Sequence, residues 1–121
     1  MPYQVKYRPQ HDYVFAEIVG EPSIDEFLAA LQEIGAASVA WTQRCVVVDL
    51  RPVRREYSFT EQLRIGQAVA RNFGHLEKAA AIVQAERITR VGEKAAHHSG
   101  AKEVSVFTSE ADAADWIRGG A

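Results

Sequence analysis

Residues 45–50, Cys45-Val46-Val47-Val48-Asp49-Leu50, form the stretch that decides the fold. The first four are a continuous apolar run, which is typical of a strand covered on both faces and not of one with a solvated face. Such a strand lies in the middle of a sheet, and helices then cover both sides of that sheet. The stretch therefore predicts a central strand of an α/β sheet, with Asp49 at its exit.

The sequence after this strand alternates helices with further strands. Ser58 and Glu61 have the spacing of a capping box, which begins a helix that Gly74 is expected to stop. The apolar face of this helix consists of Phe59, Leu63, Gly66, Val69, Ala70 and Phe73. Beyond it the pattern predicts a strand over 79–85 and a third helix that runs from Ile88 or Thr89 to Gly100. The last strand contains Val104, Val106 and Phe107. The last helix is capped by Ser109 and Asp112 and stopped by Gly119-Gly120.

The sequence before the central strand predicts a hairpin and one more helix. An alternation of apolar and polar residues, typical of a strand with one buried face, is made by Tyr3, Val5 and Tyr7. The short polar turn over 8–12 leads to a second strand over 13–19, and so short a link makes the pair antiparallel. Ser23 and Glu26 form another capping box, and we expect Gly35 to end that helix in the left-handed conformation.

The resulting order, β-β-α-β-α-β-α-β-α, is that of an α/β fold. We predict a mostly parallel five-stranded sheet with an N-terminal antiparallel hairpin and four helices covering both faces, because strand–helix–strand units pair in parallel through right-handed crossovers. No repeat or linker divides the sequence, so residues 1–121 are expected to form one domain.

Composition limits the classes of function. Of the 121 residues, 47% are apolar and 25% charged, which is the balance of an ordinary folded protein. The net charge of -2 argues against a nucleic-acid partner, since nucleic-acid-binding domains are usually basic. No apolar stretch reaches the roughly 18 residues that cross a membrane, so we expect no stable membrane insertion. The single cysteine, Cys45, cannot form an intramolecular disulfide, and we expect a cytoplasmic protein.

Three segments of the chain resemble a known family. They are Val46-Val47-Val48-Asp49-Leu50, Ala80-Ala81-Ile82-Val83, and Val106-Phe107-Thr108-Ser109-Glu110 with Ala113, Trp116 and Ile117. Together with the element order they are similar to the STAS superfamily of sulfate-transporter and anti-sigma-factor-antagonist domains. The resemblance is greatest to its bacterial SpoIIAA-like (STAS/SEC14-like) group. It implies a noncatalytic module that binds a partner protein or a small apolar or anionic ligand.

The same resemblance draws attention to the start of the helix after the central strand. The family's antagonists have an Asp-Ser-Ser-Gly-like segment there, whose serine is the phosphorylated switch. The matching region here is Glu56-Tyr57-Ser58-Phe59-Thr60-Glu61, which lacks the Asp-Ser and glycine pattern. Ser58 and Thr60 are the candidate phosphoacceptors, because a phosphate is electrostatically favoured at a helix start. The alternative is that Ser58 only caps the helix.

Arginines follow two of the predicted parallel strands. They are Arg51, Arg54 and Arg55 in the loop after the central strand, and Arg87 and Arg90 after the next strand. The carboxyl ends of parallel strands meet at one edge of a sheet, where ligands commonly bind. The helix starts near Ser58 and Thr89 add partial positive charge. The sequence therefore predicts an anion-binding site of these five arginines with Ser58. The alternative is a solvated loop neutralised by Asp49, Glu56 and Glu86.

The other notable side chains are interpreted as structural. Neighbouring His97 and His98 do not have the spacing of a helical metal pair, and we expect no metal and no cofactor. An apolar strand raises the pKa of a thiol such as Cys45 and hides it. Trp116 is expected in the core, whereas Trp41 either packs back on the core or marks a contact surface.

We therefore expect a noncatalytic binding or regulatory module whose partner is a protein or a small anionic or lipid-like ligand. One alternative is a small hydrolase or transferase that holds an anionic substrate at the arginines, with His75 or Asp49 as the reacting group. Another alternative is a structural homodimer. In that case a second copy completes the thin apolar face of the third helix, which consists of Ile88, Val91 and Ala95.

Overall fold

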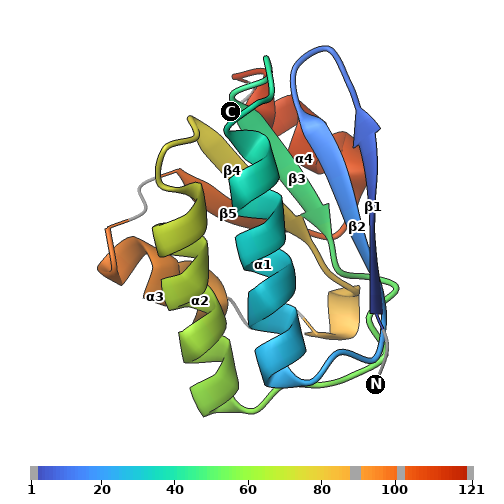
Figure 1. The fold of residues 1–121 in the computed structure, drawn as a ribbon, viewed down its shortest axis with the longest axis vertical. Coiled ribbons are helices and arrows are strands. Elements are labelled where there is room, and N and C mark those ends of the chain that lie inside the picture. Colours follow the sequence, from blue (N-terminus) through green and yellow to red (C-terminus); the bar gives the residue numbers. More distant parts are fainter. Residues whose placement is uncertain (1–2, 88–90, 101–102, 120–121) are drawn as a thin grey trace.

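The computed structural model describes residues 3–87, 91–100 and 103–119 (Figure 1). It confirms the predicted order of strands and helices and adds one short 3-10 turn. The elements are β1 (Tyr3–Pro9), β2 (Val14–Gly20), α1 (Ile24–Ser38), β3 (Cys45–Asp49), α2 (Phe59–Phe73), β4 (Lys78–Ile82), the turn η1 (Ala85–Arg87), α3 (Val91–His98), β5 (Val104–Phe107) and α4 (Glu110–Ile117).

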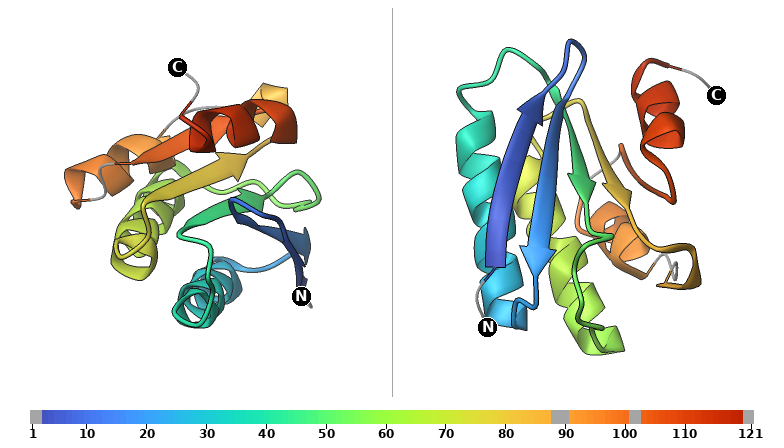
Figure 2. Two further views of the ribbon diagram at one scale, coloured as in Figure 1. Left: turned by 90° about the horizontal axis from the view of Figure 1, so that it is seen from above. Right: turned by 90° about the vertical axis from the view of Figure 1, so that its right-hand side faces the viewer.

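The five strands form one mixed sheet in the order β1-β2-β3-β4-β5. β1 and β2 pair antiparallel, and the remaining neighbours pair parallel. Each parallel connection moves one strand along in the same direction, so crossovers of one hand place their helices on one face. α1 and α2 lie on that face, α3 lies beside α2 near β5, and α4 covers the other face (Figure 2). The prediction of helices on both faces is confirmed.

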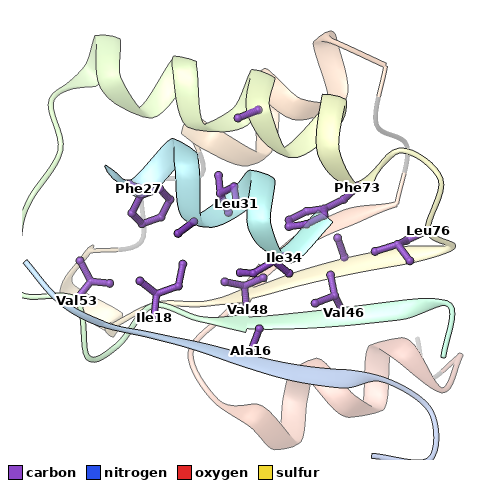
Figure 3. Close-up of a cluster of buried hydrophobic side chains, with 13 residues drawn as sticks. Ala16, Ile18, Phe27, Leu31, Ile34, Val46, Val48, Val53, Phe73 and Leu76 are labelled. Carbon is purple, nitrogen blue, oxygen red and sulfur yellow. The ribbon is translucent and has the colours of Figure 1, made fainter. Parts of the chain in front are cut away.

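The larger core lies between the sheet and the helices α1 and α2. Every residue of β3 is buried, as expected for a strand covered on both faces. Val46 and Val48 point from β3 into this core, where they meet the buried face of α1 (Figure 3). That face consists of Phe27, Ala30, Leu31 and Ile34. Since burying one large apolar side chain stabilises the fold by roughly 1.5–3 kcal/mol, this cluster is the main source of stability.

A smaller core joins α4 to the opposite face of the sheet. Its members are Tyr13, Phe15, Cys45, Val47, Ala80, Ile82, Ala113, Ala114 and Ile117. Trp116 lies at the border of this core, partly buried, with its ring centroid 5.6 Å from that of Phe107. The Nζ atom of Lys78 donates a hydrogen bond of 2.7 Å to the carbonyl of Trp116. Lys78 therefore satisfies a carbonyl in the last turn of α4.

Three of the four predicted helix starts are confirmed in atomic detail. The Ser23 hydroxyl accepts a hydrogen bond from the Glu26 amide at 3.1 Å, and the Glu26 carboxylate accepts one from the Ser23 amide at 2.8 Å. Ser58 and Glu61 repeat this reciprocal capping box at the start of α2. Ser109 accepts a hydrogen bond from the amide of Asp112 at the start of α4.

The prediction that Gly35 ends the first helix is wrong. α1 continues through Gly35 to Ser38, and its C-cap Val39 is right-handed. A Cβ atom at Gly35 would lie 2.7 Å from the backbone oxygen of Asn72 in α2, so the residue is glycine because two helices approach closely. Gly74 caps α2 as predicted, but in a right-handed conformation. Two stops have the expected positive φ: Gly100 after α3, at φ +111°, and Gly119 after α4, at φ +85°.

The third predicted helix is described only in part, as α3 (Val91–His98). Its predicted first residues, Ile88 and Thr89, lie outside the described residues, and described α3 begins at Val91. It packs against α2 and β5. Ala95 and Ala96 are buried there, so these alanines are covered within the chain itself.

Candidate functional site

A cavity of about 380 Å³ lies between the sheet and the three helices α1, α2 and α3. Its inner wall is apolar and consists of Phe27, Leu31, Val48, Ile65, Val69 and Val106. The space exists because the neighbouring positions are small. β4 contributes Ala79 and Ala81 to the lining, and α2 contributes Gly66. Ala81 remains partly exposed although it belongs to an inner strand.

Most of the polar lining of the cavity gathers at its end near the carboxyl edge of the sheet, while Gln62 of α2 and Glu93 of α3 add two polar side chains from the helices. The loop after β3 supplies Arg55, Glu56 and Tyr57, and the segment after β4 supplies Gln84, Glu86 and Arg87. Arg55, Glu56 and Glu86 are exposed to solvent, so this end is the mouth of the cavity. A parallel sheet places such loops at one edge, and that is where ligands are expected.

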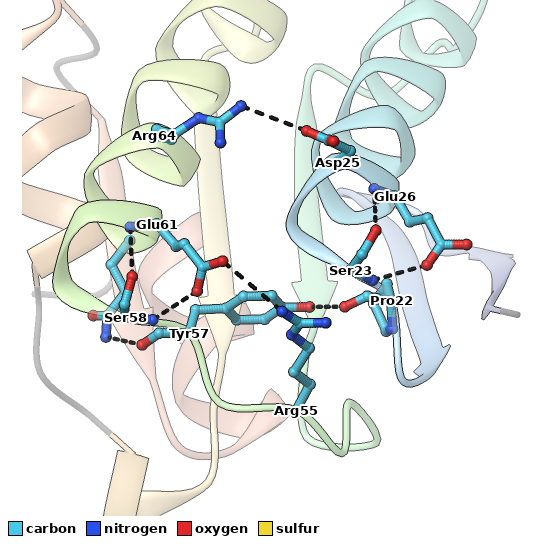
Figure 4. A network of polar contacts seen from close by, with 10 residues as sticks. Pro22, Ser23, Asp25, Glu26, Arg55, Tyr57, Ser58, Glu61 and Arg64 are labelled. Carbon is cyan, nitrogen blue, oxygen red and sulfur yellow. Dashed lines mark hydrogen bonds and ion pairs between the residues drawn. The ribbon is translucent and has the colours of Figure 1, made fainter. Parts of the chain in front are cut away.

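Tyr57 forms one wall of the mouth and ties two helix starts together (Figure 4). Its hydroxyl donates a hydrogen bond of 2.7 Å to the carbonyl of Pro22, directly before α1. Its ring packs edge-on against Phe27, with 5.1 Å between the centroids. Burial raises the pKa of Tyr57 to about 12, so the phenol remains a hydrogen-bond donor at neutral pH. The wall is therefore held in place by both polar and apolar contacts.

The start of α2 lies next to this wall. The Ser58 hydroxyl accepts the Glu61 amide at 3.1 Å, and the Ser58 amide donates to the Glu61 carboxylate at 2.9 Å. The Arg55 guanidinium lies 3.9 Å from the other oxygen of Glu61. Ser58 and Thr60 are both exposed. The capping interpretation of Ser58 is confirmed, while phosphorylation of Ser58 or Thr60 stays a prediction.

The predicted arginine cluster is spread over different surfaces. Arg55 and Arg87 both line the cavity mouth, and Arg87 donates a hydrogen bond of 2.8 Å to the carbonyl of Val53. Arg54 is exposed. Arg51 turns toward the face covered by α4, and Arg90 lies outside the described residues. Two of the predicted guanidiniums are thus brought to one site.

Arg51 belongs instead to an ionic network beside the start of α4. It donates from Nε and Nη2 to the two carboxylate oxygens of Asp49, at 2.9 and 3.0 Å. Nearby, Glu110 accepts hydrogen bonds from the Tyr13 hydroxyl at 2.7 Å and from Arg8 at 2.9 Å. Asp49 and Glu110 line a second, polar groove with Arg8 and Arg51. Carboxylates and guanidiniums already satisfy one another in this groove.

Removing the Glu110 carboxylate should change the pH dependence of stability. Burial by itself raises the pKa of Glu110, but the hydrogen bonds from Arg8 and Tyr13 outweigh it and hold the pKa below its usual value. A carboxyl with a lowered folded-state pKa stabilises the fold above its unfolded pKa of about 4.3, and that contribution disappears as the pH falls through the folded-state pKa. We expect Glu110→Gln to flatten the acid side of the profile of unfolding free energy against pH, measured by urea denaturation. The exposed control Glu21→Gln should leave the profile as in the wild type, and equal profiles for all three proteins would contradict the assignment.

Comparisons with known proteins identify the fold. No family model and no curated protein matches the sequence. Among solved structures, an anti-sigma factor antagonist from Mycobacterium paratuberculosis superposes with a TM-score of 0.66, covering 97% of this chain and 95% of that one at 16% identity. An uncharacterized protein with a SpoIIAA-like fold, from Shewanella loihica PV-4, gives a TM-score of 0.57 at 16% identity, covering 95% and 93%. The chain has the SpoIIAA-like fold.

Within this SpoIIAA-like fold the remaining candidate side chains have structural contacts. Cys45 is buried, and burial raises the pKa of its thiol, as expected for a structural cysteine. His97 Nε2 lies 2.8 Å from the carbonyl of Val104. His75 Nε2 lies 2.7 Å from the hydroxyl of buried Ser38. Trp41 packs on the larger core, with its ring edge-on to Tyr7. None of the described helices is long and apolar enough to cross a membrane.

The cavity and Tyr57 were not predicted from the sequence. Tyr57 lies between the arginines of the loop and the helix start at Ser58, where nothing in the local pattern shows that it packs on Phe27, far away in the chain. A signal for the cavity was present in the alanine run 79–81, because Ala79 and Ala81 put two small side chains on one face of an inner strand and leave the space above them unfilled. Whether neighbouring side chains close such a space depends on the packing of α2, which the sequence pattern does not specify.

Proposed function

We propose that this chain is a cytoplasmic, noncatalytic binding module for a small amphipathic molecule. The apolar part of the ligand lies in the cavity, and its anionic group is bound at the mouth by Arg55 and Arg87. The observation that carries the proposal is the cavity itself, which is apolar inside and polar at one end. Its volume of about 380 Å³ falls within the range of small-molecule sites.

The chemistry of the two ends supports this division of the ligand. Burial of apolar surface contributes about 25 cal/mol per Å², so an apolar chain gains most in the inner part of the cavity. Guanidinium groups bind carboxylate or phosphate through two parallel hydrogen bonds. Arg55 is exposed: its guanidinium lies 5.7 Å from the centroid of the Tyr57 ring and makes a long contact of 3.9 Å with Glu61. A ligand oxygen can therefore displace that contact at low cost.

The positions of the candidate reacting groups favour binding over catalysis. A general base must lie within hydrogen-bond reach of the group it serves. His75 precedes β4 and lies at the amino end of the parallel strands, opposite the mouth. The Asp49 carboxylate is buried and accepts hydrogen bonds from the side chain and the amide of Arg51. Neither group is placed to act on a ligand held by Arg55 and Arg87.

A protein partner is a second candidate. The similar protein from Mycobacterium paratuberculosis is named an anti-sigma factor antagonist, and its structure matches this chain over nearly the whole length. That name supports a regulatory role in which the ligand-bound and ligand-free modules differ in their affinity for a partner protein. The exposed Phe59, next to the mouth at the start of α2, offers an apolar contact for such a partner.

The ligand proposal is tested with saturated fatty acids of graded length and the alcohols of matching length. We expect the fatty acids to raise the melting temperature of the wild type and to bind more tightly than the alcohols in titration calorimetry. Ala81→Leu fills the inner cavity and should abolish binding. Arg87→Gln should weaken fatty-acid binding by roughly 10- to 150-fold, since a hydrogen bond between charged groups contributes roughly 1.5–3 kcal/mol.

The matched control is Arg71→Gln, an exposed arginine at the other end of α2. It should bind like the wild type. The proposal fails if no ligand of the series stabilises the wild type, or if Ala81→Leu binds as tightly as the wild type. Equal affinity for acids and alcohols would show that the anionic group does not contribute to binding, and this part of the proposal would then be wrong.

A further inference from the structure

The two edges of the sheet are treated differently by this chain. At one edge, α3 covers the outer side of β5. The carboxylate of Glu93 accepts a hydrogen bond of 2.9 Å from the amide of Val106, and the Nε2 atom of His97 lies 2.8 Å from the carbonyl of Val104. Two backbone groups of β5 that face away from β4 are thus satisfied by side chains.

The other edge is the strand β1. It is a regular strand of seven residues, and in the part of the chain that the structure describes it pairs with β2 alone. Most of its residues are exposed. Figures 1 and 2 show it along the outer margin of the sheet, with no helix beyond it. An edge strand of this length presents a row of backbone donors and acceptors that another strand can pair with.

The side chains of β1 are sorted between its two faces. Tyr3, Val5 and Tyr7 lie on the α1 side, where Tyr3 and Val5 pack on the larger core. Tyr7 is 40% exposed, and Trp41 lies beside it with 6.1 Å between the ring centroids. The other face carries Gln4, Lys6 and Arg8. The apolar residues on the α1 side of β1 therefore reach the edge of the sheet.

We propose that a second copy of this chain binds along β1, with the two β1 strands antiparallel and Val5 opposite the partner's Val5. The two sheets then form one continuous sheet with the α1 helices of both copies on the same face. In this register Tyr3 lies opposite the partner's Tyr7, and by the two-fold symmetry Tyr7 lies opposite the partner's Tyr3. Aromatic cross-strand pairs of this kind stabilise antiparallel sheets.

The sequence of β1 selects this register. A two-fold axis makes each pairing reciprocal, so the strand must be complementary to itself. Centring the axis on Lys6 would place two lysines directly opposite each other, which is unfavourable. Centring it on Val5 places Lys6 opposite the partner's Gln4, while Glu17 of β2 lies opposite Lys6 within each copy. No like charges of the described residues then face each other directly.

The occupant is a second copy because the apolar row complements itself, residue by residue. β1 lines no part of the cavity, so this proposal is independent of the ligand. It also places the interface at a different element from the third helix, whose alanines are covered by α2 and β5.

The test measures self-association of the full chain by sedimentation equilibrium over a wide range of protein concentration. The wild type should dimerise reversibly. In the proposed register residue 4 lies opposite the partner's Lys6 on both sides of the axis, so Gln4→Lys should raise the dissociation constant about tenfold and Gln4→Glu should lower it by a similar factor. Gln4 is exposed, so both variants should fold as the wild type does.

The matched controls are Gln32→Lys and Gln32→Glu on the exposed face of α1, which should leave the dissociation constant unchanged. Hydrogen exchange gives a second measurement, because the β1 amides that point away from β2 should become more protected as the concentration rises. A wild type that stays monomeric at all concentrations overturns the proposal. So does a dimer that responds equally to the variants at positions 4 and 32, or one whose β1 amides gain no protection.

Discussion

Phe27→Ala is expected to lower the free energy of unfolding by about 3–5 kcal/mol, because it removes a fully buried ring from the larger core. Phe27 is 1% exposed and lies where α1 meets β3. It also supports Tyr57, whose ring packs edge-on against it. The cavity lies directly beside this position, so few neighbouring side chains are close enough to move in and fill the space that the ring leaves. The loss should therefore fall at the upper end of that range.

The chain offers a matched control for this substitution. Phe59 is also a helical phenylalanine, but it is 65% exposed, so Phe59→Ala should change stability by less than about 0.5 kcal/mol. Urea denaturation followed by circular dichroism measures both variants, and the slope against urea should be unchanged. Similar losses for the two variants would show that Phe27 does not have the burial described here.

Local signals in the sequence account for most of the fold. The apolar run at Cys45–Val48 became a buried central strand because a parallel sheet with helices on both faces leaves no solvated side. The capping boxes at Ser23 and Ser58 were predicted correctly because they depend on side chains only three residues apart. Features that depend on neighbours close in sequence were therefore accessible without the structure.

The positions of the arginine side chains were less accessible. Parallel strands bring their following loops to one edge, but they do not set the direction of each side chain. Val47 and Asp49 point to the face covered by α4, and Asp49 draws Arg51 to that face through two hydrogen bonds. Alternation along the strand already implied the direction of Asp49. The pairing of Asp49 with Arg51, and the separation of Arg51 from Arg55, depend on the conformation of the loop, which the sequence pattern does not specify.

Glycine was the least reliable signal, since it has two different uses. It adopts left-handed turns cheaply, and it also permits two backbones to approach each other. A left-handed turn can be inferred when glycine follows a segment with helical spacing of apolar residues. A close approach of two backbones depends on a second helix that is distant in sequence. At Gly35 the apolar pattern of α1 faded at the same point where α2 crosses close to it, so the two uses could not be told apart from the sequence.

Gly35→Ala should therefore destabilise the protein, by about 1–3 kcal/mol, although alanine is the better helix former by roughly 1 kcal/mol. The added Cβ atom would lie 2.7 Å from the backbone oxygen of Asn72 and 2.9 Å from its Cβ atom. Backbone cannot rotate away as a flexible side chain does, so α1 and α2 must separate and loosen the core beneath them. Thermal and urea denaturation measure the loss. Ala36→Gly, one residue along the helix and exposed, is the control for propensity alone and should cost about 1 kcal/mol. A higher melting temperature for Gly35→Ala would mean that helix propensity outweighs the contact with α2, and that Gly35 is not needed for close packing.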